Sequence, residues 1–224
     1  MERALVYGDL LFETMKYEQG HIPHFDKHMA RLAHGMQVLN MQCSQLTERV
    51  NEHIQQALQG QSRVRIRLVV QRAGNGFYLP DSHEVKMHAE CFPLIEKANT
   101  PLTVCVYAEN YKACTPLSNL KSGNALVYVL AAMHAQRMAC DDALVLNEHG
   151  RVCEATASNI FIREGSRWIT PPLSEGCVAG IKRAVLLSEM CAIEETVSID
   201  RVRNADEIVL TNAIQGSMQV AKIL

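Results

Sequence analysis

The sequence lacks long apolar runs and any excess of one charge. None of its 224 residues lies in a stretch close to the roughly 20 consecutive apolar residues of a membrane-spanning helix. The 22 lysine and arginine residues nearly balance 24 aspartate and glutamate residues, so the formal net charge is −2. Such a charge, without long runs of one sign, predicts no affinity for nucleic acid or for an anionic membrane surface.

Paired cysteine and histidine motifs are also missing. The eight cysteines stand singly without a CxxC pair, and the nine histidines show no HExxH spacing. The sequence therefore predicts neither a disulfide framework nor a metal site. Unpaired thiols among apolar neighbours, together with a start that has no long apolar signal-peptide core, predict a cytoplasmic protein.

The chain is long enough for one large domain or two smaller ones. A polar stretch bracketed by prolines, residues 93–101, predicts a linker. We therefore expect a smaller α+β domain over residues 1–98 and a larger one over residues 99–224. A Rossmann fold is not expected, because there is no regular strand–helix alternation and no GxGxxG motif.

Hydrophobic periodicity predicts the individual elements. In the first half we expect strands at 10–18, 63–70 and 84–92, and helices that begin at Asp26 and Ser44. In the second half we expect helices at 122–138 and 181–191 among short strands, one of them at 195–199.

Lys121 is a candidate nucleophile. It stands just before the predicted helix 122–138 and beside the small residues Ser122 and Gly123. A positive charge is disfavoured at a helix N-terminus, and a lysine in such a place has a lowered pKa and can act as nucleophile and base. Taken alone, the same residue also fits an ordinary solvated lysine.

Two further features complete a recognisable set. Glu154 precedes a run of small residues, 155–159, which predicts a buried carboxylate rather than a surface acid. The turn Gly176–Arg183 places two glycines before a helix, whose free amides can bind phosphate. A lysine, a buried carboxylate and a phosphate-binding turn are what pyridoxal phosphate requires.

The order and spacing of these segments resemble the class IV aminotransferase family, the fold-type IV pyridoxal-phosphate enzymes. The resemblance extends over residues 7–220, and Leu10 departs from the usual glycine of its motif. The matching segments are Tyr7–Thr14, His28–Leu32, Glu154–Phe161, Thr170–Arg183 and Ala205–Ile214.

The resemblance implies a two-domain α+β fold similar to that of D-amino acid aminotransferase. Each domain would hold a mixed or antiparallel sheet with helices, the active site would lie in the interdomain cleft, and the protein would be a homodimer. Lys121 would bind the cofactor covalently and act as the base, and Glu154 would hold the ring nitrogen. The implied phosphate contacts are Arg31, Ile181, Lys182, Ala213 and Ile214, and the candidate substrate contacts are Asn212 and Tyr78.

Three reactions stay open within the resemblance. Branched-chain aminotransferases commonly carry a tyrosine where this chain has Leu126, and the loop 74–80 lacks the R-x-H of D-amino acid enzymes. We therefore favour a lyase that converts 4-amino-4-deoxychorismate to 4-aminobenzoate and pyruvate in folate synthesis, with Thr14 as a helper to Lys121. A branched-chain or D-amino acid aminotransferase is the alternative. Because the chain is short at both ends for the family, a non-catalytic pyridoxal-phosphate-binding homologue is the second alternative.

Overall fold

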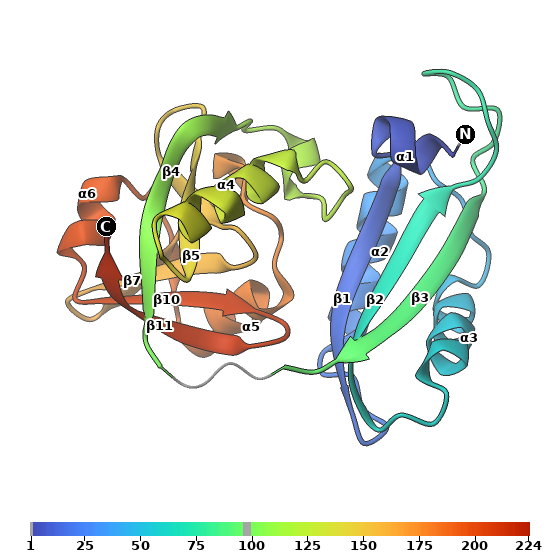
Figure 1. The fold of residues 1–224 in the computed structure, drawn as a ribbon, viewed down its shortest axis with the longest axis horizontal. Coiled ribbons are helices and arrows are strands. Elements are labelled where there is room, and N and C mark those ends of the chain that lie inside the picture. Colours follow the sequence, from blue (N-terminus) through green and yellow to red (C-terminus); the bar gives the residue numbers. More distant parts are fainter. Residues whose placement is uncertain (1, 96–99) are drawn as a thin grey trace. The chain divides into compact units, whose positions relative to one another are not determined.

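A computed structural model describes residues 2–95 and 100–224. They form two compact units, and each is described by itself (Figure 1). Residues 2–95 with Leu120–Asn124 make the first unit, and residues 100–119 with Ala125–Leu224 make the second. The expected boundary between residues 98 and 99 lies outside the described residues. Leu120–Asn124 group with the first unit, whereas the sequence places all of 99–224 in the second domain.

The first unit is a three-stranded antiparallel sheet with helices packed on one face (Figure 1). The strand order is β1-β2-β3, and α2 packs on β1 while α3 packs on β2 and β3. The elements are α1 (Arg3–Tyr7), β1 (Leu10–Glu18), α2 (Phe25–Val38), α3 (Leu46–Leu58), β2 (Arg63–Arg72) and β3 (Val85–Pro93).

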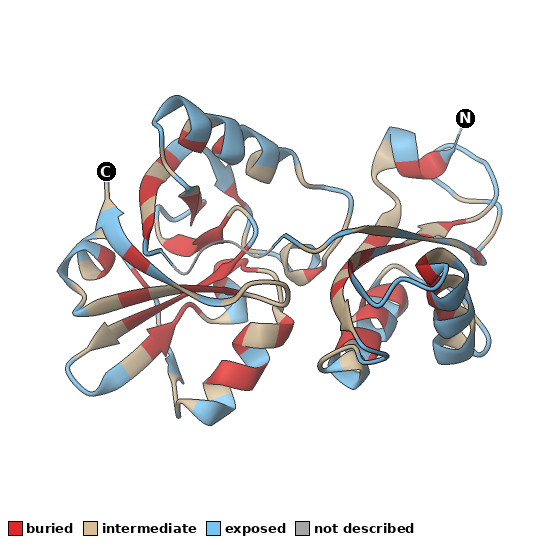
Figure 2. Ribbon diagram, turned by 60° about the horizontal axis from the view of Figure 1, so that its bottom comes forward, coloured by how far each residue is buried: buried red, intermediate tan, exposed pale blue. Residues whose placement is uncertain are grey.

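Buried and more exposed residues alternate along β1 and β2, and the buried ones form the core of this unit. Ile66 and Leu68 of β2 are fully buried, and Met15 of β1 lies opposite Ile66. Side chains of the two helices close over them, among them Leu32 and Ile54. Figure 2 shows buried segments, in red, on the strands and on the helices of this unit. Burial of each such side chain stabilises the fold by about 1.5–3 kcal/mol.

Helices α2 and α3 begin at Phe25 and Leu46, close to the predicted Asp26 and Ser44. His24 and Gln45 precede α2 and α3 in the left-handed conformation, and neither forms a side-chain cap. Asp26 instead lies in the first turn of α2, where a carboxylate favours the positive end of the helix dipole.

The second unit is built on an eight-stranded mixed sheet of order β6-β5-β4-β11-β10-β7-β8-β9. In Figure 1, α4 lies along β4 and β5, and α5 contacts β10. With the antiparallel sheet of the first unit, this confirms the expected α+β fold. The strands are β4 (Leu102–Lys112), β5 (Asp142–Asn147), β6 (Val152–Ala155), β7 (Asn159–Glu164), β8 (Arg167–Thr170), β9 (Ile193–Glu194), β10 (Glu207–Asn212) and β11 (Gly216–Ile223). The helices are α4 (Leu126–Arg137), α5 (Ile181–Glu189) and α6 (Ile199–Asn204), with 3₁₀ turns at Pro116–Asn119 and Leu173–Glu175.

The predicted strand at 195–199 forms only in part. β9 ends at Glu194, Val197 forms an isolated antiparallel bridge with Val152, and α6 begins at Ile199. Ser198 caps that helix, because its side chain accepts a hydrogen bond from the Arg201 amide at 3.2 Å. Within the described residues, no helix combines the length and the apolar character needed to cross a membrane.

Candidate active site

Glu154 is the buried carboxylate that its small neighbours predict. It lies on β6 with 3% of its surface exposed. Its Oε1 accepts hydrogen bonds from Lys112 Nζ at 2.5 Å and from the Tyr128 hydroxyl at 2.6 Å. Its Oε2 accepts from the Val178 amide at 3.0 Å and from Asn159 Nδ2 at 3.4 Å. A buried charge requires such partners, and this carboxylate has them on both oxygens.

The second unit supplies these donors from four separate elements. Lys112 ends β4, Tyr128 lies in the first turn of α4, Asn159 begins β7 and Val178 precedes α5. Burial, together with the charge of Glu154, raises the pKa of Tyr128, so its hydroxyl remains a donor. Lys112 and Tyr128 were not found from the sequence, because they stand 42 and 26 residues from Glu154.

The acceptor positions of Glu154 are filled by protein donors. A carboxylate offers about four acceptor positions, and Glu154 accepts from Lys112, Tyr128, Val178 and Asn159. The bond from Asn159 to Oε2 is the longest of these, at 3.4 Å. A protonated ring nitrogen would replace this donor on Oε2, so the residue set is compatible with pyridoxal phosphate.

The start of α5 offers backbone donors to an anion. Gly180 precedes the helix, and its carbonyl accepts the first helical bond from the Ala184 amide at 3.0 Å. The amides of Ile181 and Lys182 lie in the first turn, whose N–H groups have no partner inside a helix. Gly180 is required here, since a Cβ would lie 1.8 Å from Asn159 Oδ1. The turn thus combines helix-dipole charge with a close approach of backbone, as phosphate binding demands.

The loop between β10 and β11 uses part of its hydrogen-bonding capacity internally. Asn212 Oδ1 accepts from the amides of Ile214 at 2.9 Å and Gln215 at 2.8 Å, and Asn212 Nδ2 donates to Ser158 Oγ at 3.0 Å. Asn212 therefore shapes the turn that holds Ala213. Contacts of Asn212, Ala213 and Ile214 with a ligand remain predictions.

Lys121 lies in the first unit, in an extended segment beside β1. Its carbonyl accepts from the Phe12 amide at 2.9 Å, and Gly123 N donates to the Leu10 carbonyl at 3.2 Å. Its Nζ lies 4.5 Å from the centre of the Phe12 ring, a cation–π contact. The expected place at a helix start is wrong, because α4 begins only at Leu126.

Thr14 shares a face of β1 with Phe12. Successive strand side chains point to opposite faces, and the alternation buries Leu11 and Met15 on the other side. The ammonium group of Lys121 lies over Phe12, two residues from Thr14 along the strand. The strand therefore presents the hydroxyl of Thr14 on the face that Lys121 covers.

Arg31 is held by the buried Glu13. Arg31 Nε and Nη2 lie 2.8 and 2.5 Å from the two oxygens of this carboxylate, and His28 Nδ1 lies 2.7 Å from Oε2. Burial alone would raise the pKa of Glu13, but hydrogen bonds from His28 and Arg31 outweigh it and hold the pKa below the usual value. The pairing fixes the direction of Arg31, whose contact with phosphate remains a prediction.

Tyr78 stands in the loop between β2 and β3 of the first unit. Its side chain is 89% exposed, and its ring centre lies 5.5 Å from that of Tyr7. Arg3 fixes the loop by donating to backbone carbonyls, including that of Gly76 at 3.1 Å. A substrate contact of Tyr78 remains a prediction.

The predicted site residues thus fall into two sets. The first unit holds Thr14, Arg31, Tyr78 and Lys121, and the second holds Glu154, Ile181, Lys182, Asn212, Ala213 and Ile214. Within the first set, the ammonium group of Lys121 lies over the ring of Phe12, two residues from Thr14 along β1. Within the second, Asn159 links Glu154 to the turn before α5, because it contacts Glu154 and its Nδ2 donates to the Val178 carbonyl at 3.0 Å.

Residues 10–223 match the sequence model of the family described as amino-transferase class IV. The chain belongs to the class IV aminotransferase family. Members of this family use pyridoxal phosphate, and the chain is accordingly a pyridoxal-phosphate-dependent enzyme.

Relatives of this chain carry names from more than one branch of the family. The aminodeoxychorismate lyase of Vibrio harveyi is 25% identical over 99% of this chain and 86% of its own length. A Methanocaldococcus jannaschii protein, provisionally named a branched-chain-amino-acid aminotransferase, is 27% identical over 99% of this chain and 81% of its own length. The crystal structure of 4-amino-4-deoxychorismate lyase from Pseudomonas aeruginosa is similar with a TM-score of 0.89, at 26% identity over 99% of this chain and 86% of that one.

Proposed function

We propose that this class IV enzyme is a lyase that converts 4-amino-4-deoxychorismate to 4-aminobenzoate and pyruvate. The observation that carries the proposal is the shared face of β1, where the ammonium group of Lys121 covers Phe12 beside Thr14. The lyase needs a base for a carbon-bound proton and a donor for the leaving group. A lysine and a hydroxyl on one face supply both. The lyase names among relatives that cover nearly the whole chain support the same reaction.

The reaction balances without a second substrate. The C–H bond at the amine-bearing ring carbon breaks, and the bond between the ring and the enolpyruvyl oxygen breaks with it. The ring becomes aromatic as 4-aminobenzoate, and the leaving group takes a proton to become pyruvate. We assign the first proton transfer to Nζ of Lys121 and the second to the hydroxyl of Thr14.

The residues of the second unit would hold the cofactor. Glu154 would accept the ring N–H on Oε2, and the amides of Ile181 and Lys182 would receive the phosphate. When bound, pyridoxal phosphate supplies an electron sink for the charge left on the carbon that loses its proton. Lys112 and Tyr128 keep Glu154 oriented and ionised for this contact. We also propose a cytoplasmic homodimer, which light scattering coupled to size exclusion would test for assembly.

The decisive experiment follows both products from one reaction. The protein loaded with pyridoxal phosphate is mixed with 4-amino-4-deoxychorismate, and 4-aminobenzoate and pyruvate are measured together. We expect equal amounts of both at a catalytic rate. A protein that is visibly yellow but forms neither product would contradict the lyase proposal.

Two pairs of variants test the assigned roles. Lys121→Ala should abolish both the yellow colour and turnover, whereas Lys27→Ala, at an exposed site in α2, should change neither. Thr14→Val should slow product formation by roughly 10²-fold or more, and Thr14→Ser should restore most of the rate. Equal rates for Thr14→Val and wild type would remove Thr14 from the reaction.

An amino acid aminotransferase is the second candidate function. It is favoured by the Methanocaldococcus jannaschii relative, whose similarity spans 99% of this chain. The same yellow protein would then convert 2-oxoglutarate to glutamate in the presence of a branched-chain L-amino acid or a D-amino acid. A yellow protein inactive in both assays would instead support the non-catalytic homologue.

A further inference from the structure

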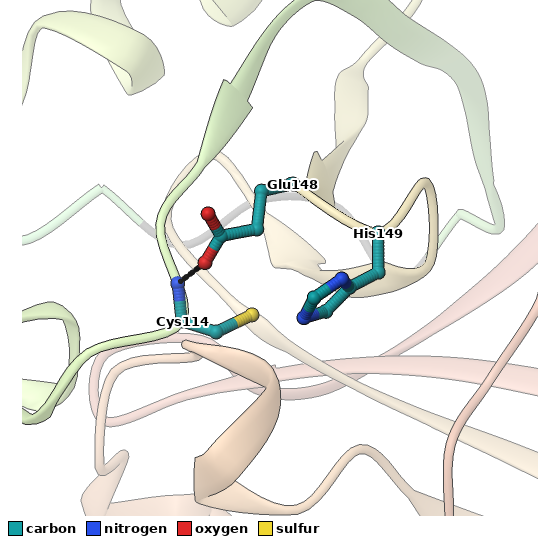
Figure 3. A group of neighbouring side chains, drawn as sticks. All are labelled: Cys114, Glu148 and His149. Carbon is teal, nitrogen blue, oxygen red and sulfur yellow. Dashed lines mark hydrogen bonds between the residues drawn. The ribbon is translucent and has the colours of Figure 1, made fainter.

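A thiol, a carboxylate and an imidazole converge at one corner of the second unit. Cys114 lies two residues beyond the end of β4, and Glu148 and His149 form the turn between β5 and β6 (Figure 3). The Sγ of Cys114, a carboxylate oxygen of Glu148 and a ring nitrogen of His149 all lie within 4.8 Å of one another. Figure 3 shows the Cys114 thiol and the His149 ring directed toward each other.

The backbone holds this corner in a fixed arrangement. The Glu148 amide donates to the Lys112 carbonyl at 2.9 Å, and the Cys114 amide donates to Glu148 Oε1 at 2.7 Å. The buried Asn147 accepts the His149 amide on its Oδ1 at 3.1 Å. The two segments are thus joined by hydrogen bonds before any ligand binds. Preorganisation of this kind favours a metal site.

The donor set points to zinc and similar cations. Zinc takes cysteine sulfur, histidine nitrogen and carboxylate oxygen, and it often keeps a fourth, open position beside three protein ligands. Magnesium and calcium instead prefer oxygen donors alone. We propose that Cys114, Glu148 and His149 bind one divalent cation of the zinc class.

A cation here would join the end of β4 to the β5–β6 turn. Because Lys112 ends β4 and also holds Glu154, the cation would stiffen the strand end that supports Glu154.

Sequence spacing could not show this site. Cys114 and Glu148 are 34 residues apart, and no short motif connects them. The pairing of β4 with β5 brings them together, since Lys112 lies opposite Asn147 in the parallel register.

Cobalt titration tests the proposal. The full chain is stripped with a chelator, kept reduced with a phosphine, and titrated with Co²⁺ while difference spectra are recorded against metal-free protein. We expect one Co²⁺ per chain with a near-ultraviolet thiolate-to-cobalt band. Cys114→Ser should abolish the band, and Cys191→Ser, at an exposed cysteine, should keep it. Absence of the band in wild type, or an unchanged band in Cys114→Ser, would overturn the proposal.

A second variant covers the case in which Cys114→Ser does not fold. His149→Gln changes an exposed turn residue and should weaken Co²⁺ binding by roughly tenfold or more. His88→Gln, an exposed histidine in β3, is its control. Equal Co²⁺ affinity of His149→Gln and wild type would also overturn the proposal, whatever the enzymatic activity of the protein.

Discussion

Loss of Lys112 should destabilise the second unit more than loss of any exposed lysine. The side chains of Lys112 and Glu154 are 8% and 4% exposed, and their charged atoms lie 2.5 Å apart. Removal of one partner from a buried ion pair costs about 3–5 kcal/mol, because the other charge is left buried. In Lys112→Met, Tyr128 and the Val178 amide still donate to Glu154. We therefore expect the lower end of this range, about 3 kcal/mol.

A double-mutant cycle separates the pair from the loss of packing. In Lys112→Met with Glu154→Gln, both charges are gone, and replacement of a whole buried pair is often close to neutral. The double variant should thus be more stable than Lys112→Met alone by about 2 kcal/mol. Lys222→Met, at an exposed position in β11, is the matched control and should stay within about 0.5 kcal/mol of wild type.

Urea unfolding followed by tryptophan fluorescence measures these free energies. The single tryptophan, Trp168, lies on β8 and so reports on the second unit. A shift in the midpoint at constant slope measures the change in stability. If Lys112→Met and Lys222→Met unfold at the same urea concentration, the ion pair does not stabilise this unit. If the cycle gives no coupling, Lys112 acts through packing alone.

Three further predictions concern Glu13, Gly180 and Cys177. The pKa of Glu13 in the folded protein is held below its usual 4.5. Ionised Glu13 therefore stabilises the fold above pH 4.5, and this stabilisation is lost as the pH falls through the pKa of Glu13 in the folded state. Acid unfolding followed by far-ultraviolet circular dichroism should therefore depend less on pH below 4.5 in Glu13→Gln, and an unchanged profile would contradict this account. Gly180→Ala should weaken pyridoxal-phosphate binding at least tenfold, as measured by equilibrium dialysis. The Cβ of the alanine would displace Asn159 and deform the start of α5. Equal affinity of the variant and wild type would show that the turn is not the phosphate site. Burial and the charge of Glu154 raise the pKa of Cys177 to about 12. Iodoacetamide at pH 8 should therefore alkylate the exposed Cys191 long before Cys177, as followed by mass spectrometry. Comparable alkylation rates of the two thiols would refute the burial argument.

The sequence predicts most of the fold because most of its strands have one buried face. The period-2 alternation of Arg63–Arg72 reappears as buried and exposed residues along β2. The small run after Glu154 correctly predicts burial of that carboxylate. Of the strand expected at 195–199, only an isolated bridge at Val197 forms, because Ser198 caps a helix that begins at Ile199. Sequence patterns therefore predict helices and strands well where buried residues recur periodically. They predict them less well where one capping residue decides whether a helix or a strand forms.

The environment of Lys121 shows why the site is harder to predict than the fold. The sequence argument places this lysine at a helix start and lowers its pKa through the helix dipole. The structure instead pairs its carbonyl with the amide of Phe12, more than a hundred residues earlier in the chain, and places its ammonium over the Phe12 ring. A ring face stabilises a cation, whereas a helix N-terminus disfavours it, so the two environments act on the charged state in opposite directions. The sequence could not show this contact, because only the hydrogen bonds between β1 and residues 121–123 bring Phe12 and Lys121 together.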